Sequence, residues 1–424
     1  MTVSDSGGFA QSVNDGVIAP VPRVSIHAFC ESQSVAALVS NAAQDRRMQK
    51  AAVKTQMGGL AAALSAYEEA QTPNVIVLEV GADNASFLNG LDSLAQFCDA
   101  GTRVIVIGRI NDITFYRALI LRGVSDYLVE PLDLLGFIRA ISELYGKSGA
   151  APLGRLVAVC GAKGGVGAST VAHHMAWSIA HRVGMSTVIA DFDLPFGTAG
   201  LNFNQDPLQG IAEAVFSSDR LDANMLDRLM TKCSDQLTLL AAPSTLGRDY
   251  DFDEAAFDGL LDLLRASAPV IVLDVPHVWS AWSRRLLGAV DEVVVVAAPD
   301  LASLRNTKNL LDALAPVRIN DAKPRLVMNM VGVPNRPEIA TKEFAAPINT
   351  EPSGVIPYNP KLFGAATNKG QMVAEVQGGA KFAEIFEKIG RIVVGKPELQ
   401  NLKKSSLIES LKSTKLSIGI GKRS

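Results

Sequence analysis

The sequence predicts an α/β protein in which two domains follow one another, each with a parallel sheet covered by helices. Three observations support this fold class. Short runs rich in β-branched residues alternate with longer helical runs over most of the chain. The chain of 424 residues exceeds the length at which a single hydrophobic core usually stops growing. Between the two stretches of alternation, residues 146–154 are small, Gly-rich and poor in charge, as linkers are.

The first stretch of alternation, residues 23–145, predicts one domain. Its expected strands are 23–29, 74–80, 102–108 and 126–129, and its expected helices run to about Lys54, lie near Leu94, end at Leu121 and occupy 134–146. Residues 1–22 lack the basic start and apolar core of a secretory signal, and their composition predicts a disordered leader. The apolar runs of the whole chain are far shorter than a membrane helix requires. We therefore expect a cytoplasmic protein.

The end of this domain, "RGVSDYLVEPLD" at 122–133, resembles the receiver (CheY-like) domains of two-component response regulators, and the resemblance extends over most of 23–145. A receiver needs acidic residues after its first strand, an aspartate at the end of its third strand and a lysine before the proline that follows its fifth. This chain has Glu31 alone, Glu79 and Glu130 at those places. Because Glu130 reverses the charge that would stabilise an incoming phosphate, we expect no phosphotransfer. The resemblance then implies a domain for docking or dimerisation, with Glu79 as a mimic of a phosphorylated state as the alternative.

The second stretch, residues 155–394, predicts a larger parallel sheet. Its expected strands are 155–160, 187–193, 237–243, 269–275, 292–299, 325–331 and 354–358, with helices between them. Each is a short, mostly apolar run, as strands buried on both faces are. Residues 395–424 form a net basic tail with leucines at roughly helical spacing. The tail is either an amphipathic helix that rests on an anionic membrane or a partner, or a solvated flexible segment, and its composition favours the flexible segment.

Residues 161–170, "GAKGGVGAST", follow the first of these strands and open a helix, which is the place of a phosphate-binding loop. Backbone N–H groups surround a phosphate where glycine lets the chain come close, and the helix end attracts the anion. The common loop nevertheless fails at two places. Ala162 replaces its first glycine, and Ala168 replaces the lysine that contacts the β- and γ-phosphates. Ser169 retains the hydroxyl that binds Mg²⁺ in such loops.

The preserved "KGG" resembles the deviant loop of the MinD/ParA ATPases, and further segments match that family in order. The resemblance implies that Lys163 reaches the phosphates of a partner subunit in an ATP-bound dimer. It implies that Asp193, in "VIADFDLPFG", positions the attacking water, and that Asp274, in "VIVLDVP", holds Mg²⁺ through water. Asn329, in "LVMNMV", is placed where the family contacts adenine, and "IPYN" resembles the next base-facing loop. The match spans residues 155–392 and implies a P-loop NTPase domain.

This resemblance implies ATP and Mg²⁺ as cofactors. Lys163 and Asp193 are the expected catalytic residues, and Ser169 and Asp274 are the expected residues at the metal. The expected nucleotide contacts come from the loop, the helix start and one later strand: Lys163, Gly164, Gly165, Val166, Gly167, Ala168, Ser169, Thr170 and Asn329. Because Ala168 removes a positive charge from the γ-phosphate, we expect ATP hydrolysis to be weak or absent.

An incomplete receiver-like domain in front of a MinD/ParA-like domain resembles the CpaE/TadZ family of pilus assembly proteins. The resemblance implies an ATP-dependent homodimer that serves as a localisation and assembly factor of a Tad-type (Flp) pilus secretion system. Its direct partners would be components of that pilus machinery. It also implies a position at a cell pole and peripheral to the inner membrane, where the basic tail would contact the membrane.

Three other functions compete with this one. A ParA-like partition ATPase would bind DNA non-specifically through a basic surface, but the net charge is −3 and no basic cluster lies outside the tail. A two-component regulator conflicts with Glu79 and Glu130. An iron–sulfur reductase needs cluster-ligating cysteines, whereas the four cysteines here are widely separated and predict reduced thiols. We therefore expect no specific nucleic acid as a partner.

Several aromatic side chains near the loop have more than one expected role. His277, Trp279 and Trp282 either form part of a switch loop that faces a partner or pack in the core. His173 and His174, on the helix after the loop, are expected to be surface or packing residues rather than ligands.

Overall fold

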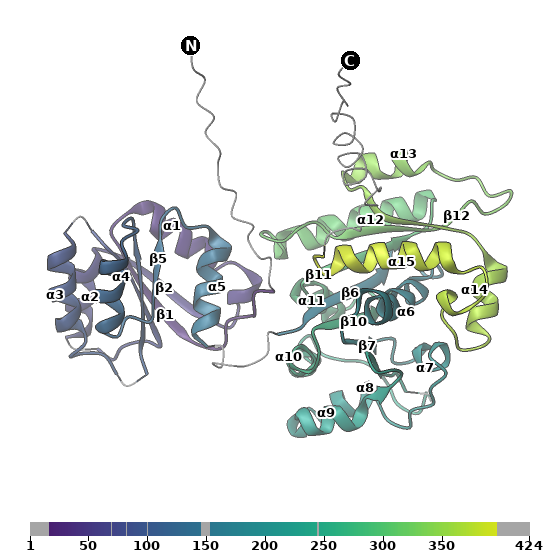
Figure 1. Ribbon diagram of the computed structural model, residues 1–424, viewed down its shortest axis with the longest axis horizontal. Helices are drawn as coiled ribbons and strands as arrows, with labels where there is room; N and C mark the ends of the chain where they lie inside the picture. The colour runs from purple at the N-terminus through teal and green to yellow at the C-terminus, as the bar shows by residue number, and fades with distance from the viewer. Residues whose placement is uncertain are drawn as a thin grey trace, which may run out of the picture.

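The structure is a computed structural model that describes residues 17–145 apart from 69, 82 and 100, and residues 153–396 apart from 244 and 245. It contains two sheets, each with its own helices, which lie side by side in Figure 1. The expected leader over 1–16, the linker over 146–152 and the tail over 397–424 lie outside the described residues. Among the residues that are described, no helix is long and apolar enough to cross a bilayer.

In the described part of the first domain, five parallel strands form a sheet in the order β2-β1-β3-β4-β5. The strands are β1 (Ser25–Cys30), β2 (Ala52–Met57), β3 (Val75–Glu79), β4 (Arg103–Gly108) and β5 (Asp126–Val129). The helices are α1 (Gln33–Ala42), α2 (Gly59–Tyr67), α3 (Asn84–Leu94), α4 (Ile113–Leu121) and α5 (Leu134–Leu144). This is the flavodoxin-like strand order, which CheY also has, and it confirms the expected fold.

Helices cover both faces of the first sheet. α1 and α5 pack on one face around Val39, Phe137 and Ile141, and α2, α3 and α4 pack on the other around Phe87 and Leu119. In Figure 1, α2, α3 and α4 form the outer left of the molecule, while α5 lies toward the second sheet. Four of these helices begin at a polar cap whose side chain accepts a backbone N–H group: Ser32, Asp83, Asp112 and Asp133.

The beginning of the first domain differs from the expectation. α1 ends at Ala42, and Lys54 lies in strand β2 rather than in a helix. β2 is an edge strand without a fully buried residue, so it lacks the continuous apolar run that marks the other strands. Ile18 and Val21 pack into the core beside α1 and α5, so this core includes residues from the segment expected to be a disordered leader.

The described residues of the second domain form an eight-stranded sheet in the order β13-β12-β11-β6-β10-β7-β9-β8. The strands are β6 (Arg155–Gly161), β7 (Thr187–Asp191), β8 (Thr231–Lys232), β9 (Leu237–Leu240), β10 (Val270–Val275), β11 (Glu292–Ala297), β12 (Arg325–Val331) and β13 (Pro352–Pro357). All are parallel except the short β8, which pairs antiparallel with β9. The parallel strands are those expected from the sequence, and only β8 is additional.

Two layers of helices enclose the second sheet. The helices are α6 (Ala168–Ser178), α7 (Ala199–Asn202), α8 (Ile211–Phe216), α9 (Ala223–Leu229), α10 (Asp258–Ser267), α11 (Ala281–Ala289), α12 (Leu301–Leu314), α13 (Thr341–Ala345), α14 (Pro360–Thr367) and α15 (Ala380–Val393). α6 and α15 pack on one face through residues such as Val171 and Phe386. α10, α11 and α12 pack on the other face through Leu264, Leu286 and Leu314. The sheet is therefore buried on both sides, as its apolar strands predict.

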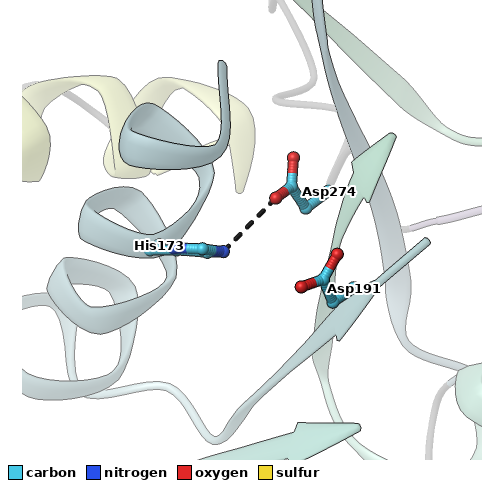
Figure 2. Close-up of side chains that lie close together, drawn as sticks. All are labelled: His173, Asp191 and Asp274. Atoms are coloured by element: carbon cyan, nitrogen blue, oxygen red, sulfur yellow. Dashed lines mark ion pairs between the residues drawn. The ribbon is translucent and has the colours of Figure 1, made fainter. Parts of the chain in front are cut away.

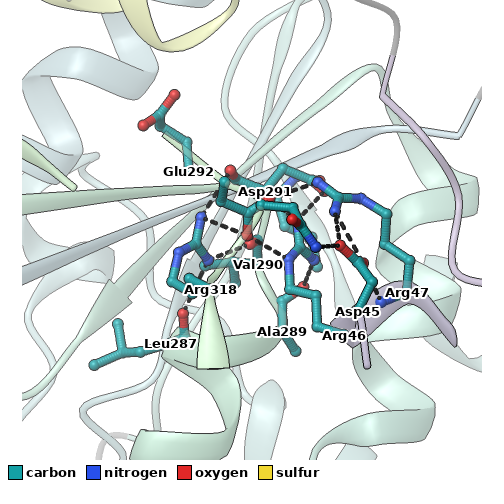
Figure 3. Close-up of polar contacts among 12 residues, drawn as sticks. Asp45, Arg46, Arg47, Leu287, Ala289, Val290, Asp291, Glu292 and Arg318 are labelled. Carbon is teal, nitrogen blue, oxygen red and sulfur yellow. Dashed lines mark hydrogen bonds and ion pairs between the residues drawn. The ribbon is translucent and has the colours of Figure 1, made fainter. Parts of the chain in front are cut away.

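A buried network of arginines and aspartates joins the two domains (Figure 3). Arg46 lies in the 3₁₀ turn η1 (Arg46–Met48) between α1 and β2. Its guanidinium lies 2.6 Å from Oδ2 of Asp321 and 3.4 Å from Oδ1 of Asp291. It also donates a hydrogen bond of 2.6 Å to the carbonyl oxygen of Ala289. The side chains of Arg46, Asp291 and Asp321 are at most 9% exposed, so water screens these charges little.

Further arginines from both domains complete the network. Arg47 pairs with Asp45 of its own turn and with Asp321, and Arg265 pairs with Asp291 at 2.6 Å. Burial raises the pKa of Asp291 and of Asp321, but the neighbouring guanidinium groups outweigh burial, so both pKa values lie below the ordinary range. Asp291 and Asp321 precede β11 and β12. The first domain therefore docks on the edge where the strands of the second sheet begin.

Candidate functional site

The predicted site residues of the second domain meet at the edge where its parallel strands end. β6 lies between β10 and β11, and β7 lies beyond β10. Ligands of open α/β sheets bind at this carboxyl edge, because loops and helix N-termini converge there. β6 leads into residues 162–167 and then into α6, while Asp191 and Asp274 stand opposite each other in the register of β7 and β10.

Residues 162–167 have the backbone of an anion cradle. Gly165 and Gly167 have φ angles of +78° and +81°, a region that residues with a side chain rarely adopt. Gly167 precedes the first residue of α6, and a Cβ at this position would lie 2.6 Å from the side-chain nitrogen of Asn329. Gly164 and Gly165 are exposed, with open space beside them. The exposed glycine backbone and the N-terminus of α6 together suit a phosphate group.

Side chains from three other elements hold the loop in place. His277, after β10, donates from Nδ1 to the last carbonyl group of β6 at 2.9 Å. Asn306 of α12 donates to the carbonyl oxygen of Ala162 at 3.0 Å. Asn329 of β12 donates to the carbonyl oxygen of Val166 at 2.8 Å. Because each bond is made to the loop backbone, the shape of the cradle is fixed by the protein itself.

Lys163 is paired within its own chain. Its Nζ lies 2.8 Å from Oδ2 of Asp300, the residue that caps the N-terminus of α12. Both side chains are partly exposed, and ion pairs of this kind contribute about 0–1 kcal/mol. The pairing is therefore weak enough for Lys163 to exchange it for a phosphate contact.

Three buried side chains lie together beneath the loop: His173 of α6, Asp191 of β7 and Asp274 of β10 (Figure 2). Nε2 of His173 lies 3.3 Å from Oδ2 of Asp274. Burial and the neighbouring charge of Asp274 raise the pKa of Asp191 to about 7, since both disfavour its charged form. Asp191 also accepts the backbone N–H of Ala199 at 3.0 Å, which ties the segment after β7 to the sheet. Asp193 lies in that segment, and burial raises the pKa of its carboxyl group.

The residues expected at the metal come from α6 and β10. Ala168, Ser169 and Thr170 form the first turn of α6, directly after the cradle, and all are partly exposed. Asp274 lies on β10, the strand next to β6. A hydroxyl and a carboxylate are oxygen ligands of the kind that Mg²⁺ prefers, and Mg²⁺ usually keeps several waters. The donor set at Ser169 and Asp274 therefore fits a magnesium ion that is bound with a nucleotide.

A cavity of about 310 Å³ adjoins the start of α6. Thr170, Asn329 and Tyr358 contribute to its lining, as does Asn359, the residue that caps α14. The structure thus brings Asn329 and the "IPYN" segment together, as expected for a base-facing pocket. The amide nitrogen of Asn329 is already bonded to the loop, so this residue also braces the cradle, a role that the sequence did not indicate.

The aromatic residues near the loop divide between core and surface. Trp282 is buried in the core, whereas Trp279 is 53% exposed. Trp279 and His277 line a second cavity, of about 350 Å³, beside the start of the loop. His173 and His174 are both buried, so they pack inside the domain and do not lie on the surface. Burial lowers the pKa of His174 to about 4, which keeps its ring neutral.

Sequence reasoning missed three residues that shape the site. Asp191 is the first aspartate of "DFD", so its place at the end of an apolar strand was a usable signal. Asp300 and Asn306 lie more than 130 residues after the loop in sequence, at the cap and on the side of α12. Nothing in the local sequence around them indicates contact with the loop.

The corresponding edge of the first domain is acidic. Glu79 ends β3 and is 3% exposed, and its Oε2 accepts the backbone N–H groups of Glu31 and Ser32 at 2.8 and 2.9 Å. A carboxylate of the chain therefore already binds the N-terminus of α1. Glu130 pairs with Arg109 at 3.4 Å near the surface. The position where a receiver keeps its lysine therefore holds a carboxylate that is paired with Arg109.

The sheet order, the glycine cradle and α6 define the class of the second domain as a P-loop fold of the MinD/ParA type. The ParA family ATPase from Chlorobium tepidum TLS is 23% identical, with a TM-score of 0.51 over 56% of this chain and 98% of that chain, which shows the fold. The MinD protein of Helicobacter pylori is 28% identical over 258 residues, which are 57% of this chain and 90% of that protein. Residues 155–329 match the family described as cellulose biosynthesis protein BcsQ.

The N-terminal portion has a relative of its own. The pilus assembly protein CpaE from Caulobacter crescentus CB15 is 46% identical, and the match covers 31% of this chain and all of that crystallised chain, with a TM-score of 0.30. This identity over the full length of the other chain carries the assignment. The chain belongs to the CpaE family of pilus assembly proteins.

Proposed function

We propose that the chain is an ATP-binding, dimerising factor that localises and assembles a Tad-type (Flp) pilus secretion system, with little or no ATP hydrolysis. The observation that carries the proposal is the glycine cradle at 162–167, with Ala168 in the place of the phosphate lysine. The cradle, the N-terminus of α6, Ser169 and Asp274 supply most contacts for phosphates and Mg²⁺. None of these contacts depends on the side chain of residue 168, so binding is retained while catalysis is weakened.

In this proposal each part of the site has a separate task. Bound Mg²⁺ would offset the negative charge of the phosphates. Asp193, on the segment anchored by Asp191, positions the attacking water. Thr170 and Asn329 border the pocket for the base. The exposed Trp279 and its cavity lie beside the loop, which suits a surface that a partner recognises when nucleotide is bound.

Calorimetric titration of the full chain with ATP and Mg²⁺ tests the proposal directly. We expect saturable binding at or below millimolar nucleotide, with a phosphate-release rate close to the background of the assay. Absence of binding at millimolar ATP would reduce the loop to a scaffold and refute the proposal. Rapid hydrolysis by the unmodified chain would refute only the part that concerns slow turnover.

Dimerisation rests on Lys163. In the structure this lysine is partly exposed and paired only weakly with Asp300, and the resemblance to the MinD/ParA loop supports a role for it at the phosphates of the partner subunit. Lys163→Ala should therefore weaken the ATP-dependent dimer by about 10²- to 10⁴-fold, because a hydrogen bond to a charged group contributes about 1.5–3 kcal/mol and a symmetric dimer loses two of them. Sedimentation velocity with and without Mg-ATP measures this effect.

Lys308→Ala is the matched control. Lys308 also makes a surface ion pair, with Asp312 at 3.0 Å, but it lies along α12 instead of at the loop. We expect its ATP-dependent dimerisation to equal that of the unmodified chain. Equal dimerisation by the unmodified chain and both variants would show that Lys163 does not contribute to the dimer interface.

The first domain and the tail serve placement in this proposal. The first domain is a docking module for pilus components, and the basic tail adds contact with an anionic membrane at the cell pole. A cytoplasmic, membrane-peripheral position follows from these two roles together. The incomplete acidic site of the first domain supports docking over signalling, because Glu79 already fills the N-terminus of α1.

We expect the first domain to take no phosphoryl group from acetyl phosphate. Glu79 is buried and bonded to two backbone N–H groups, and Glu130 repels an incoming phosphate. Glu79→Asp restores the residue type of an acceptor but leaves Glu130 in place, so it should also remain unmodified. Intact-mass spectrometry after incubation with acetyl phosphate and Mg²⁺ checks both chains. A phosphate adduct on the unmodified chain, mapped to the first domain, would show that the site is active.

A further inference from the structure

The buried group of His173, Asp191 and Asp274 has the composition of a metal site. Each residue offers one ligand atom, and these atoms all lie within 4.8 Å of one another. The three side chains come from α6, β7 and β10 and point toward one another in Figure 2. All three are almost completely buried, at 0, 0 and 2% exposure.

The two carboxyl groups of this site have no lysine or arginine beside them in the described residues. Asp191 accepts two backbone N–H groups, from Asp193 and Ala199, which stabilise its charge without neutralising it. Buried carboxylates are normally paired with a cation or bound to a metal ion. Asp274 faces His173, and a metal ion bound between the three side chains would supply positive charge to both carboxyl groups.

His173 is oriented as a ligand would be. Its Nδ1 lies 2.8 Å from the side-chain amide of Asn202, whereas its Nε2 is buried, 3.3 Å from Asp274, and makes no hydrogen bond to a described residue. A metal-bound histidine commonly donates its second ring N–H to a fixed partner, which sets the ring orientation. In the structure the amide nitrogen of Asn202 faces Nδ1. Turning the amide over leaves its shape unchanged and puts the oxygen at Nδ1, where it accepts the ring N–H and leaves Nε2 free to bind the metal.

We propose that His173 Nε2 and one carboxylate oxygen from each of Asp191 and Asp274 bind a divalent transition-metal ion such as Zn²⁺. Imidazole combined with carboxylates favours zinc and its neighbours, whereas Mg²⁺ is bound by oxygen ligands. Zinc lies about 2.0–2.2 Å from such donors in a tetrahedral arrangement, so two donors on one ion are about 3.4 Å apart. The donor atoms here lie within 4.8 Å of one another, so the widest separation has to contract by up to about 1.4 Å, which rotation of the side chains would supply.

The site goes beyond the proposed function, which places Mg²⁺ with the nucleotide at Ser169 and Asp274. Both sites use Asp274, so a bound transition-metal ion and Mg-ATP exclude each other. The exclusion rests on the proposed function, whereas the metal site itself does not. This exclusion would make the binding of Mg-ATP to the cradle depend on the concentration of free transition-metal ions.

Calorimetric titration of the full chain with ZnCl₂, after treatment with a chelator and without nucleotide, tests the site. We expect one equivalent to bind, and His173→Gln to weaken binding by at least about 10- to 100-fold. His181→Gln is the matched control, because His181 lies on the continuation of α6 but is exposed and stacks on Trp177. Its zinc affinity should equal that of the unmodified chain.

A second variant and two spectra distinguish loss of the metal site from misfolding and from zinc binding at cysteine thiolates. Among the described residues, the side chain of Asp274 forms its ion pair with His173, so Asp274→Asn should fold, and it should lose zinc as His173→Gln does. Far-ultraviolet circular dichroism confirms folding of each variant. The proposal is overturned if the unmodified chain binds no zinc, if either variant keeps full affinity, or if Co²⁺ substitution gives an intense thiolate charge-transfer band. Because no nucleotide is present, failure here leaves the ATP proposal untouched.

Discussion

Arg46→Ala is expected to loosen the docking of the first domain by about 3 kcal/mol, roughly a hundredfold in the docking equilibrium. The substitution leaves Asp321 and Asp291 buried with less positive charge beside them. It also removes the hydrogen bond to the carbonyl oxygen of Ala289. We place the loss at the low end of the range for broken buried pairs because Arg47 and Arg265 still face the same aspartates. A urea titration followed by circular dichroism should show the first transition at lower denaturant, by about 1 M or more.

Lys50→Ala is the control for this experiment. Lys50 also reaches across to the second domain, to Asp262 at 3.0 Å, but both side chains are about half exposed. Exposed ion pairs contribute about 0–1 kcal/mol, so the urea transition should barely move. An Arg46→Ala transition that coincides with that of Lys50→Ala would show that the network does not hold the domains together.

The docking network also predicts a pH dependence. The pKa values of Asp321 and Asp291 are lowered in the folded protein, where burial raises them but the guanidinium groups prevail. Their contribution to stability is therefore fully present above the ordinary aspartate pKa of 3.8 and is lost as the pH falls through the lowered folded values. The stability difference between the unmodified chain and Arg46→Ala should stay constant near neutral pH and shrink below about pH 4.

Ala168→Lys is expected to raise ATP hydrolysis by about 10²- to 10³-fold over the unmodified chain. Residue 168 is the first of α6, directly after the cradle, and it is partly exposed, so a longer side chain can extend toward bound phosphates. An ammonium group there adds the positive charge that the γ-phosphate lacks in the transition state. A lysine in the first turn opposes the helix dipole, so we also expect a loss of about 0.3–1 kcal/mol in stability. Phosphate release at saturating ATP measures the rate.

Two further variants show whether the added charge is responsible. Ala168→Met has a similar length without the charge and should leave hydrolysis at its low level. Adding Asp193→Ala to Ala168→Lys should abolish the gain while ATP still binds, since Asp193 is assigned to the water and not to the phosphates. An equal rise with methionine would attribute the effect to packing around α6 instead of to charge.

The strands and the loop were predictable because their signals are local. The parallel strands of the second sheet are continuous apolar runs, and "KGGVGAST" fixes a strand, a turn and a helix start within a few residues. β2 was not predicted because an edge strand needs no apolar run, so "AVKTQM" resembled the end of a helix. Local sequence therefore identified the apolar strands of both sheets but missed the edge strands β2 and β8.

The rest of the site and the docking network depend on contacts between distant parts of the chain. Arg46 and Asp321 are 275 residues apart, and either one alone is an ordinary surface charge in the sequence. His173 follows a phosphate loop on a helix that is buried over most of its length, and its sequence neighbour His174 is buried as well, so the sequence alone does not show which histidine faces the sheet. Only the packing of α6 on β7 and β10 shows that His173 faces two aspartates.

The docking of the first domain on the amino edge of the second sheet leaves the loop edge uncovered. Two copies that meet through their loops would share a two-fold axis there, and their first domains would then stand at opposite extremes of the pair. Such a pair is bivalent, with identical binding modules that face away from each other. Simultaneous attachment of both modules to two copies of a partner would raise the overall affinity without any new contact. Nucleotide would then control how tightly the protein attaches to its partners, because it sets whether one first domain or two are available for binding.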